Sequence, residues 1–358
     1  MTPAEEARWD AAAARHDEGM DLLASGAVAD AAVAVDAALA DLAELLGQDH
    51  PEVGHVRVSR GMIAVAAGQL EVARVDLEAG LAVLDAWEDD AGLPLRVRAR
   101  VAYGDLLRQL GAYDDAVAVL RRARTEVEAL DPDDPQVPIA SNALGIALRF
   151  AGDYDASAEV YGRALASYTQ DTPDDLAARA TVLHNLAGLA HGRGDIAGGE
   201  ACIREALALR ARLADGGPGV ALDLGLLATL LDQAGRTEEA LATFEQAAAA
   251  IAAGFPPDHP EHGYLAHNRG DAFLGAGLLP DAEAAYRSAW ALKAAALGAG
   301  HPEVALTQAR LAHVLAASER HDEAVALATM ARAAAREGLP AGHPFRETIE
   351  DIAAALNL

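Results

Sequence analysis

The chain has 358 residues, of which 52% are apolar but only 4% are aromatic, and its formal net charge is −27. This length fits two or three ordinary domains or one elongated array of repeats, and the core must be built mainly from Ala, Leu and Val. The single cysteine, Cys202, excludes an intramolecular disulfide and a zinc site made of several cysteines. The single lysine, Lys293, lies in ALKAAAL, which excludes a Walker A loop and a kinase-type lysine.

The N-terminal 26 residues lack the cationic start and apolar stretch of a signal peptide, and no run approaches 18 uncharged apolar residues. We therefore expect a cytoplasmic protein without a membrane segment. Its Ala-rich composition, with arginine far in excess of lysine, is typical of a GC-rich bacterial genome. The acidity disfavours nucleic acid as a partner, because no basic stripe is present to release counterions.

Glycines in similar local settings recur along the chain in steps of 41 to 43 residues. We call these positions the turn residues: Gly26, Gly68, Gly111, Gly152, Gly194, Gly235, Gly277 and, in the eighth place, Glu319. The same period relates two nearly identical phrases, LLGQDHPEVG at 45–54 and ALGAGHPEVA at 296–305. A fixed period of this length predicts a repeat architecture.

Each period predicts a pair of helices on either side of the turn residue. A proline 17 residues before the turn marks the start of the first helix, where its missing N–H costs nothing. These prolines are Pro51, Pro94, Pro135, Pro218, Pro260 and Pro302. The fifth repeat has Pro173 four residues early, with Thr172 as the cap, so its first helix should gain about one turn. In the eighth repeat, Asp322 is the expected cap of the second helix.

Small residues explain how the two helices of a pair approach each other. Seven residues before each turn lies a small residue: Gly19, Gly61, Gly104, Gly145, Ala187, Ala228, Gly270 or Ala312. Nine residues after it lies an often larger apolar or aromatic one, such as Leu77, Leu120, Tyr161, Ile203, Phe244 or Tyr286. The pattern predicts that the backbones of the two helices approach closely where bulk is absent, and that the larger residue fills space in the core.

The pattern resembles the tetratricopeptide repeat family, in its kinesin-light-chain-like variety with a 42-residue unit. GDYDASAEVYGRAL at 152–165 and LHNLAGLAHGRGD at 183–195 are most similar to the family pattern, and the resemblance covers essentially the whole chain. It implies an all-α, right-handed superhelical solenoid of about eight repeats over residues 1–343, with the first helices lining a concave wall. Residues 344–358 are expected to form a C-terminal capping helix.

The resemblance implies a non-enzymatic scaffold or adaptor that binds a peptide or partner helix in the concave groove. The predicted groove residues are Arg98, Arg108, Asn142, Arg149, Phe150, His184, Asn185, Tyr264, His267, Asn268 and Asp271. An arginine cluster favours a ligand with an acidic or C-terminal carboxylate end; alternatively, these arginines pair with Asp105 and neighbouring acids. The asparagines are expected either to hold the ligand backbone or to satisfy helix carbonyls.

The motifs of catalysis and of metal or cofactor binding are weak. His184 and His191 are seven residues apart, about 10.5 Å along a helix, which is too far for a shared zinc ion. GRGDIAGG at 192–199 imitates a dinucleotide loop but lies in a helical corner without a preceding strand. No serine lies in G-x-S-x-G. We therefore expect no catalytic residue, no metal, no cofactor and no enzymatic activity.

Two other functions stay open at the level of the sequence. The chain could be a regulatory or sensor module that acts with a separately encoded signalling NTPase or protease. It could also bind a small molecule, or act as a cryptic enzyme, through His184, His267 and Asp271. The apolar positions Ile139, Ile146 and Leu222 are either a binding strip or, in a homo-oligomer, a dimer seam.

Overall fold

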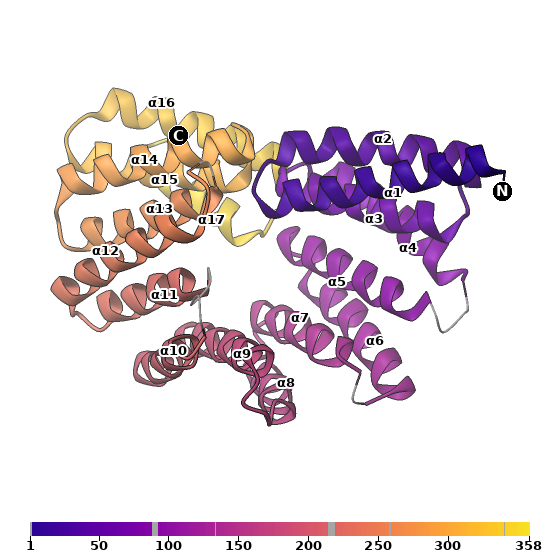
Figure 1. The fold of residues 1–358 in the computed structure, drawn as a ribbon. Helices are drawn as coiled ribbons and strands as arrows, with labels where there is room; N and C mark the ends of the chain where they lie inside the picture. Colours follow the sequence, from indigo (N-terminus) through magenta and orange to yellow (C-terminus); the bar gives the residue numbers. More distant parts are fainter. Residues whose placement is uncertain (1, 88–91, 133, 214–218, 258, 340) are drawn as a thin grey trace. The chain divides into compact units, whose positions relative to one another are not determined.

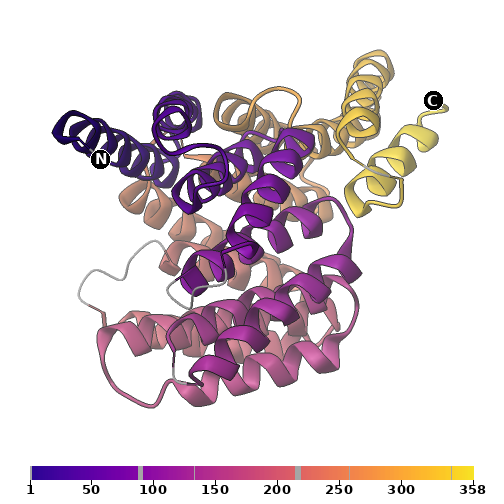
Figure 2. The same cartoon turned by 90° about the vertical axis from the view of Figure 1, so that its right-hand side faces the viewer.

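The computed structural model describes residues 2–87, 92–132, 134–213, 219–257, 259–339 and 341–358. All regular structure in these ranges is helical, which confirms the predicted all-α class (Figures 1 and 2). The helices are α1 (Pro3–Ala24), α2 (Val28–Leu46), α3 (Pro51–Ala66), α4 (Leu70–Asp85), α5 (Leu93–Gln109), α6 (Tyr113–Leu130), α7 (Gln136–Phe150), α8 (Tyr154–Ser167), α9 (Pro173–Gly192), α10 (Ile196–Arg210), α11 (Gly219–Gln233), α12 (Thr237–Gly254), α13 (Pro260–Gly275), α14 (Leu279–Leu297), α15 (Pro302–Ala317), α16 (His321–Gly338) and α17 (Pro344–Ala355).

The helices belong to two compact units. Unit 1 consists of Met1–Ala147 and Ala296–His301, and unit 2 consists of Leu148–Ala295 and Pro302–Leu358. Within unit 1, α1 packs on α2, α3 on α4 and α5 on α6; within unit 2, α9 packs on α10, α11 on α12 and α15 on α16 (Figure 1). The helix α17 packs against α15 and α16.

Every turn residue has a left-handed backbone. The seven glycines have φ between 72° and 88°, the region that glycine adopts without steric cost. Glu319 adopts the same conformation with φ 64° although it carries a side chain. The Arg320 N–H donates to Leu315 at 2.9 Å, as the Leu278 N–H donates to Phe273 at 2.9 Å. The corner without glycine therefore keeps the hydrogen bonding of the corner before it.

The helix starts follow the predicted proline signals. His50, His259 and His343 each precede a proline and accept, on Nδ1, the backbone N–H two residues on, at 3.2, 3.3 and 3.1 Å. Thr172 caps α9 by accepting the Asp175 N–H at 3.2 Å, and α9 has 20 residues where α3 has 16. Both features confirm the prediction for the fifth repeat. The prediction for Asp322 is wrong, because the N-cap of α16 is Arg320, two residues earlier, and it forms no side-chain cap.

The paired helices meet at the predicted small residues. A Cβ atom added to Gly61 would lie 2.6 Å from Cγ of Leu77, and one added to Gly270 would lie 2.8 Å from Cε1 of Tyr286. Both distances are well inside van der Waals contact. The glycines are therefore needed so that the two backbones can come close enough to bury the large side chain between them.

The core is a chain of small apolar clusters, one at each stack of helices. In unit 1, Ala31, Val35 and Leu42 of α2 pack with Val53 and Val56 of α3. In unit 2, one such cluster joins α9, α10 and α11, and another joins α15, α16 and α17. Because each stack buries its own cluster, a charged residue at a core position must find its partner on the adjacent helix.

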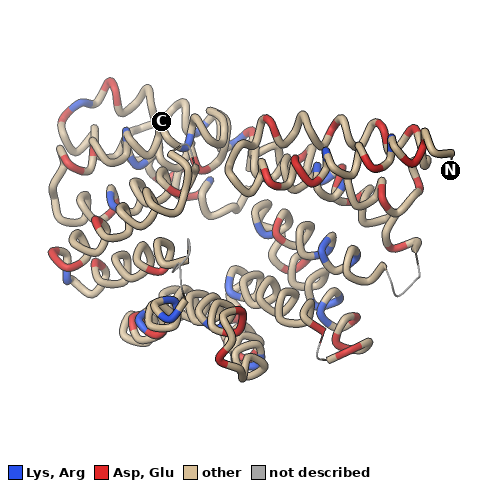
Figure 3. Tube along the Cα trace, viewed as in Figure 1, with Lys and Arg blue, Asp and Glu red and all other residues tan. Residues whose placement is uncertain are grey.

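The charged residues are interleaved rather than segregated. Figure 3 shows Lys and Arg scattered among Asp and Glu along the helices of both units. Among the described residues, no helix is long and apolar enough to cross a membrane.

Candidate functional site

The predicted groove residues lie mainly on the first helices of unit 2. We call α9, α11, α13 and α15 the first-helix row. Eight of the eleven predicted residues belong to unit 2, and six of these lie on α9 or α13. Polar side chains join α9 to α11 and α13 to α15, and these two joints are the candidate functional site.

The joint between α9 and α11 is centred on a buried carboxylate. Asp223 is completely buried, and its Oδ1 lies 2.8 Å from Nδ1 of His184. Its Oδ2 accepts a hydrogen bond from Nε of Arg210, the last residue of α10, at 2.6 Å. Both carboxylate oxygens are therefore engaged, as a buried charge requires. The His184 side chain keeps 30% of its surface exposed.

The joint between α13 and α15 uses the histidine at the corresponding repeat position. His267 and His184 both lie ten residues before their turn residue. Nδ1 of His267 lies 3.0 Å from Oγ1 of Thr307, and its Nε2 lies 3.6 Å from Asp271. Burial holds the pKa of His267 well below its ordinary value of 6.5, and the positive charges of Lys293 and Arg310 lower it further.

The predicted groove residue Asp271 is engaged within the same joint. It accepts the hydroxyl of Tyr286 at 2.5 Å and lies 3.5 Å from Nε of Arg310. Burial raises the pKa of Asp271, an effect that the hydrogen bond from Tyr286 and the charge of Arg310 oppose. Because Asp271 binds both the second helix of its own pair and the next first helix, its first role is to fix the joint.

The only lysine of the chain is buried beneath this joint. Lys293 of α14 is 1% exposed and donates to Glu303 of α15 at 2.8 Å. Its ammonium nitrogen lies 4.6 Å from the ring centroid of Tyr264, a cation–π contact. Burial lowers the pKa of Lys293, while Glu303 acts in the opposite direction. Burial also raises the pKa of the nearby Glu261. The predicted groove residue Tyr264 therefore covers an ion pair.

At the start of unit 2, Arg149 contacts the next first helix. Its Nη1 donates to the Gly188 carbonyl of α9 at 3.2 Å, and its guanidinium carbon lies 4.7 Å from the ring centroid of Phe150. Phe150 remains 40% exposed. His191 of α9 is influenced by the same arginine, since burial first and the charge of Arg149 second lower its pKa. An exposed ring with a cation over its face can receive an apolar group next to an anionic one.

Asn185 and Asn268 follow the two histidines of the row, one residue later in each case. Asn268 is exposed and Asn185 is half-buried. Their predicted contact with a ligand backbone stays a prediction.

The three remaining predicted residues lie in unit 1. Arg98 is exposed, and its charge acts on His16 and His55. Arg108 donates to Asp105 at 2.6 Å, the internal pairing that the sequence left as an alternative. Asn142 is half-buried on α7.

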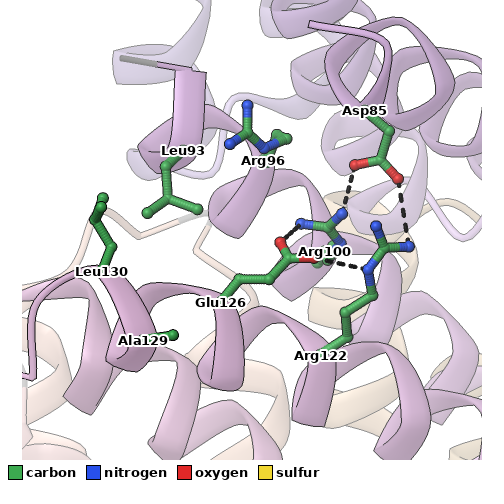
Figure 4. A pocket seen from close by; sticks show the side chains of 8 residues that line it. All are labelled: Asp85, Leu93, Arg96, Arg100, Arg122, Glu126, Ala129 and Leu130. Carbon is green, nitrogen blue, oxygen red and sulfur yellow. Dashed lines mark hydrogen bonds and ion pairs between the residues drawn. The ribbon is translucent and has the colours of Figure 1, made fainter. Parts of the chain in front are cut away.

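Unit 1 also contains a cavity of about 570 Å³ that the sequence did not indicate. Arg100, only 2% exposed, lies between Asp85 and Glu126 and donates to each at 2.5 Å (Figure 4). Arg122 donates to Glu126 at 2.7 Å, while Leu93 and Leu130 border the other end. Burial lowers the pKa of Arg100, and the two carboxylates oppose this effect. The ion pairs hold α4, α5 and α6 together at this cavity.

Sequence reasoning missed Arg210, Asp223, Lys293, Glu303 and Thr307. The repeat register contains the missing signal. Sixteen residues after the turn, most repeats have a buried apolar side chain: Leu42, Leu84, Val127, Ile251 and Ala335. Arg210 and Lys293 occupy this position in the fifth and seventh repeats. A base at an otherwise apolar position indicates a buried ion pair with the next helix.

The site offers hydrogen bonds and charge rather than an evident metal site. Among the described residues, no group of three or more His, Cys, Asp and Glu is placed to hold a metal ion. The polar side chains of the row connect one helix pair to the next.

These stacked helix pairs define an all-α repeat protein of the solenoid class. The family model for the tetratricopeptide repeat matches residues 95–170 and 178–253. These two segments are therefore identified as tetratricopeptide repeats, the family that the sequence pattern resembles. No relative was found among the curated proteins.

Solved structures share this fold. A Rap protein complexed with competence and sporulation factor is 11% identical, with a TM-score of 0.59 over 92% of this chain and 99% of its own. The apo form of RapI is 14% identical, with a TM-score of 0.58 over 79% of this chain and 98% of its own. The TPR-like repeats assigned to a kinesin light chain of Podosopora anserina are 20% identical, with a TM-score of 0.42 over 56% of this chain and 95% of theirs.

Proposed function

We propose that this protein is a non-enzymatic scaffold that binds a peptide or partner helix along its first helices. The observation that carries the proposal is the exposed ring of Phe150 with the guanidinium of Arg149 over its face. The same guanidinium also contacts α9, the next first helix. Tetratricopeptide repeats, and a similar Rap structure that holds a bound factor, support a partner-binding role.

The chemistry at Arg149 suggests what the partner carries. A carboxylate, from an acidic side chain or a C-terminus, complements the guanidinium, and an apolar side chain beside it complements the ring. Rigid aromatic and arginine residues supply most of the binding energy in typical interfaces. We therefore expect the tightest peptides to end in an apolar residue with a free carboxylate.

A peptide screen tests this proposal. Random dodecamers with free C-termini are selected on the full chain, and the best binder is measured by fluorescence anisotropy in free and amidated form. We expect Phe150→Ala and Arg149→Ala to weaken binding at least tenfold, and amidation to weaken it similarly. The control is Leu278→Ala, which removes a leucine of similar exposure, 41%, at a corner outside the row. A screen without saturable binders would contradict the proposal.

A further inference from the structure

The side chain of His184 is more exposed to solvent than that of His267, its counterpart in the row. Its side chain is 30% exposed, whereas that of His267 is 8% exposed. Nδ1 of His184 faces the buried Asp223 at 2.8 Å, so the rest of the ring points away from the carboxylate. Among the described residues, none forms a hydrogen bond with Nε2 of His184.

The direction of the His184 hydrogen bond follows from its partners. An ionised carboxylate can only accept, and a guanidinium can only donate. As a carboxylate that accepts from Arg210 at Oδ2, Asp223 also accepts at Oδ1, which places a proton on Nδ1 of His184. When the ring is neutral, a proton on Nδ1 leaves Nε2 bare, and Nε2 is then a hydrogen-bond acceptor.

We infer that Nε2 of His184 is a ligand-facing acceptor, positioned by Asp223 and Arg210, that takes an N–H donor of the bound partner. The donor is a backbone amide or the side chain of a Lys or Arg. This inference rests on the proposed function and deepens it, because it assigns the partner's hydrogen-bonding chemistry at one position of the row.

The surroundings of His184 favour a donor over an acceptor. Glu261 on α13 is close enough for its charge to act on His184, and Asp223 lies behind the ring. Arg210 compensates one of these two negative charges. The remaining negative potential attracts an N–H group and repels a carboxylate.

His267 provides a control inside the same protein. Its partner Thr307 donates its hydroxyl proton to the Glu303 carbonyl at 2.9 Å, so the Thr307 oxygen accepts from Nδ1 of His267. Its Nε2 already faces Asp271 at 3.6 Å. The same residue type at the same repeat position is therefore not available to a ligand.

Nitrogen-15 NMR of the full chain, with labelled histidine, tests the tautomer without any ligand. Near pH 8 we expect Nδ1 of His184 to be protonated and Nε2 bare. In Asp223→Asn the amide oxygen accepts from Arg210, so the NH₂ group faces His184 and the proton moves to Nε2. A wild-type ring with the proton on Nε2, or on both nitrogens, overturns the inference.

The binding arm uses the best dodecamer selected on the wild-type chain. We expect His184→Ala and Asp223→Asn each to weaken it at least tenfold, and His321→Ala, at the exposed start of α16 outside the row, to change it less than twofold. Unfolding curves show whether each variant is folded. His184→Gln, whose amide oxygen can accept, should recover part of the affinity. Equal affinities of the wild type, His184→Ala and Asp223→Asn overturn the inference and leave the proposed function standing.

Changes in the peptide show whether the hydrogen-bond donor is a backbone amide or a side chain. Single N-methylation along the backbone should abolish the effect of His184→Ala at one position if a backbone amide is the donor. Replacement of each Lys or Arg by Met should abolish it if a side chain is the donor. A library that yields no binder overturns the ligand role of His184 together with the proposed function, while the NMR result still decides the tautomer.

Discussion

The joint between α9 and α11 and the joint between α13 and α15 use a histidine and a base at the same repeat positions. They differ in whether these two groups bind one acceptor or two. Each has a histidine ten residues before the turn and a base sixteen residues after it. In the first joint, Asp223 alone binds both His184 and Arg210. In the second joint, Thr307 binds the histidine and Glu303 binds the lysine. Sharing one acceptor couples the two bonds, whereas separate acceptors keep them independent.

The difference teaches how a repeat array acquires an individual site. Where one carboxylate holds both groups, the histidine is fixed by its Nδ1 and leaves its other edge to solvent. Where the acceptors are separate, the histidine is enclosed and serves packing. Because buried polar groups stabilise only when every partner is present, the shared carboxylate should be the more sensitive of the two designs.

The largest expected effect is that of Asp223→Ala. It removes both bonds of the first joint and leaves Arg210 as an uncompensated, largely buried charge, so we expect a loss of about 3–5 kcal/mol in unfolding free energy. Urea denaturation followed by circular dichroism measures it. The matched control, Asp174→Ala on the exposed start of α9, should cost less than about 0.5 kcal/mol. A loss below about 1 kcal/mol for Asp223→Ala would contradict the coupled design.

Lys293→Met should cost less, about 2 kcal/mol, because Glu303 keeps 23% exposure and can be partly rehydrated. The double variant Lys293→Met with Glu303→Leu should return to within about 1 kcal/mol of the wild type, since an apolar pair can replace a buried ion pair. Urea denaturation of both variants measures the coupling. Additive losses in the double variant would show that the pair is not what stabilises this joint.

The second joint should be sensitive to acid. The pKa of His267 lies well below 6.5 in the folded chain because the ring is buried. The unfolded chain therefore binds more protons, so stability that is present above pH 6.5 is lost as the pH falls below it, by up to about 1.4 kcal/mol per pH unit. Asp271, Arg310, Lys293 and Thr307 face the ring and remain in the test variant, His267→Asn.

Unfolding free energies at a series of pH values from 7.5 downward measure this effect. The slope should be smaller in His267→Asn than in the wild type, while the contributions of the other histidines are the same in both chains. Parallel pH profiles for the two chains would rule out the predicted contribution of His267.

The smallest expected effect is that of Thr307→Val. It removes the hydrogen bond with His267 and the one that the hydroxyl donates to the Glu303 carbonyl, while it keeps the shape of the side chain. We expect a loss of about 1 kcal/mol in unfolding free energy. Thermal and urea unfolding measure it against Thr181→Val, where the hydroxyl lies on an exposed surface. A loss as large as that of Asp223→Ala would remove the contrast between the two joints.

Much of the fold could be predicted because each repeat contains the residues that determine its own turn, helix start and helix contact. Three signals can be recognised within one repeat: the spacing of the turn residues, the His-Pro helix starts and the small residue where two helices meet. The structure shows them at Gly68, His50 and Gly61. The cap at Asp322 failed because every second helix begins two residues after its turn residue, which places the cap of the eighth repeat at Arg320.

The candidate site was predicted only in part. His184, His267 and Asp271 could be chosen because the repeat register places them on first helices. Their partners could not, because Asp223 and Thr307 are 39 and 40 residues away, and only the stacking of one helix pair on the next brings the side chains together.

By itself, the sequence determined the class of protein, the period of the helix pairs and the positions that must be small. These three features follow from backbone conformation and from the packing of residues that are near each other in the sequence. The same pattern of residues recurs in each repeat. Only the tertiary structure decided which polar side chains are satisfied and which still face solvent. That choice depends on distances between separate helix pairs, and in water-excluded joints a hydrogen bond exists or fails within a few tenths of an ångström.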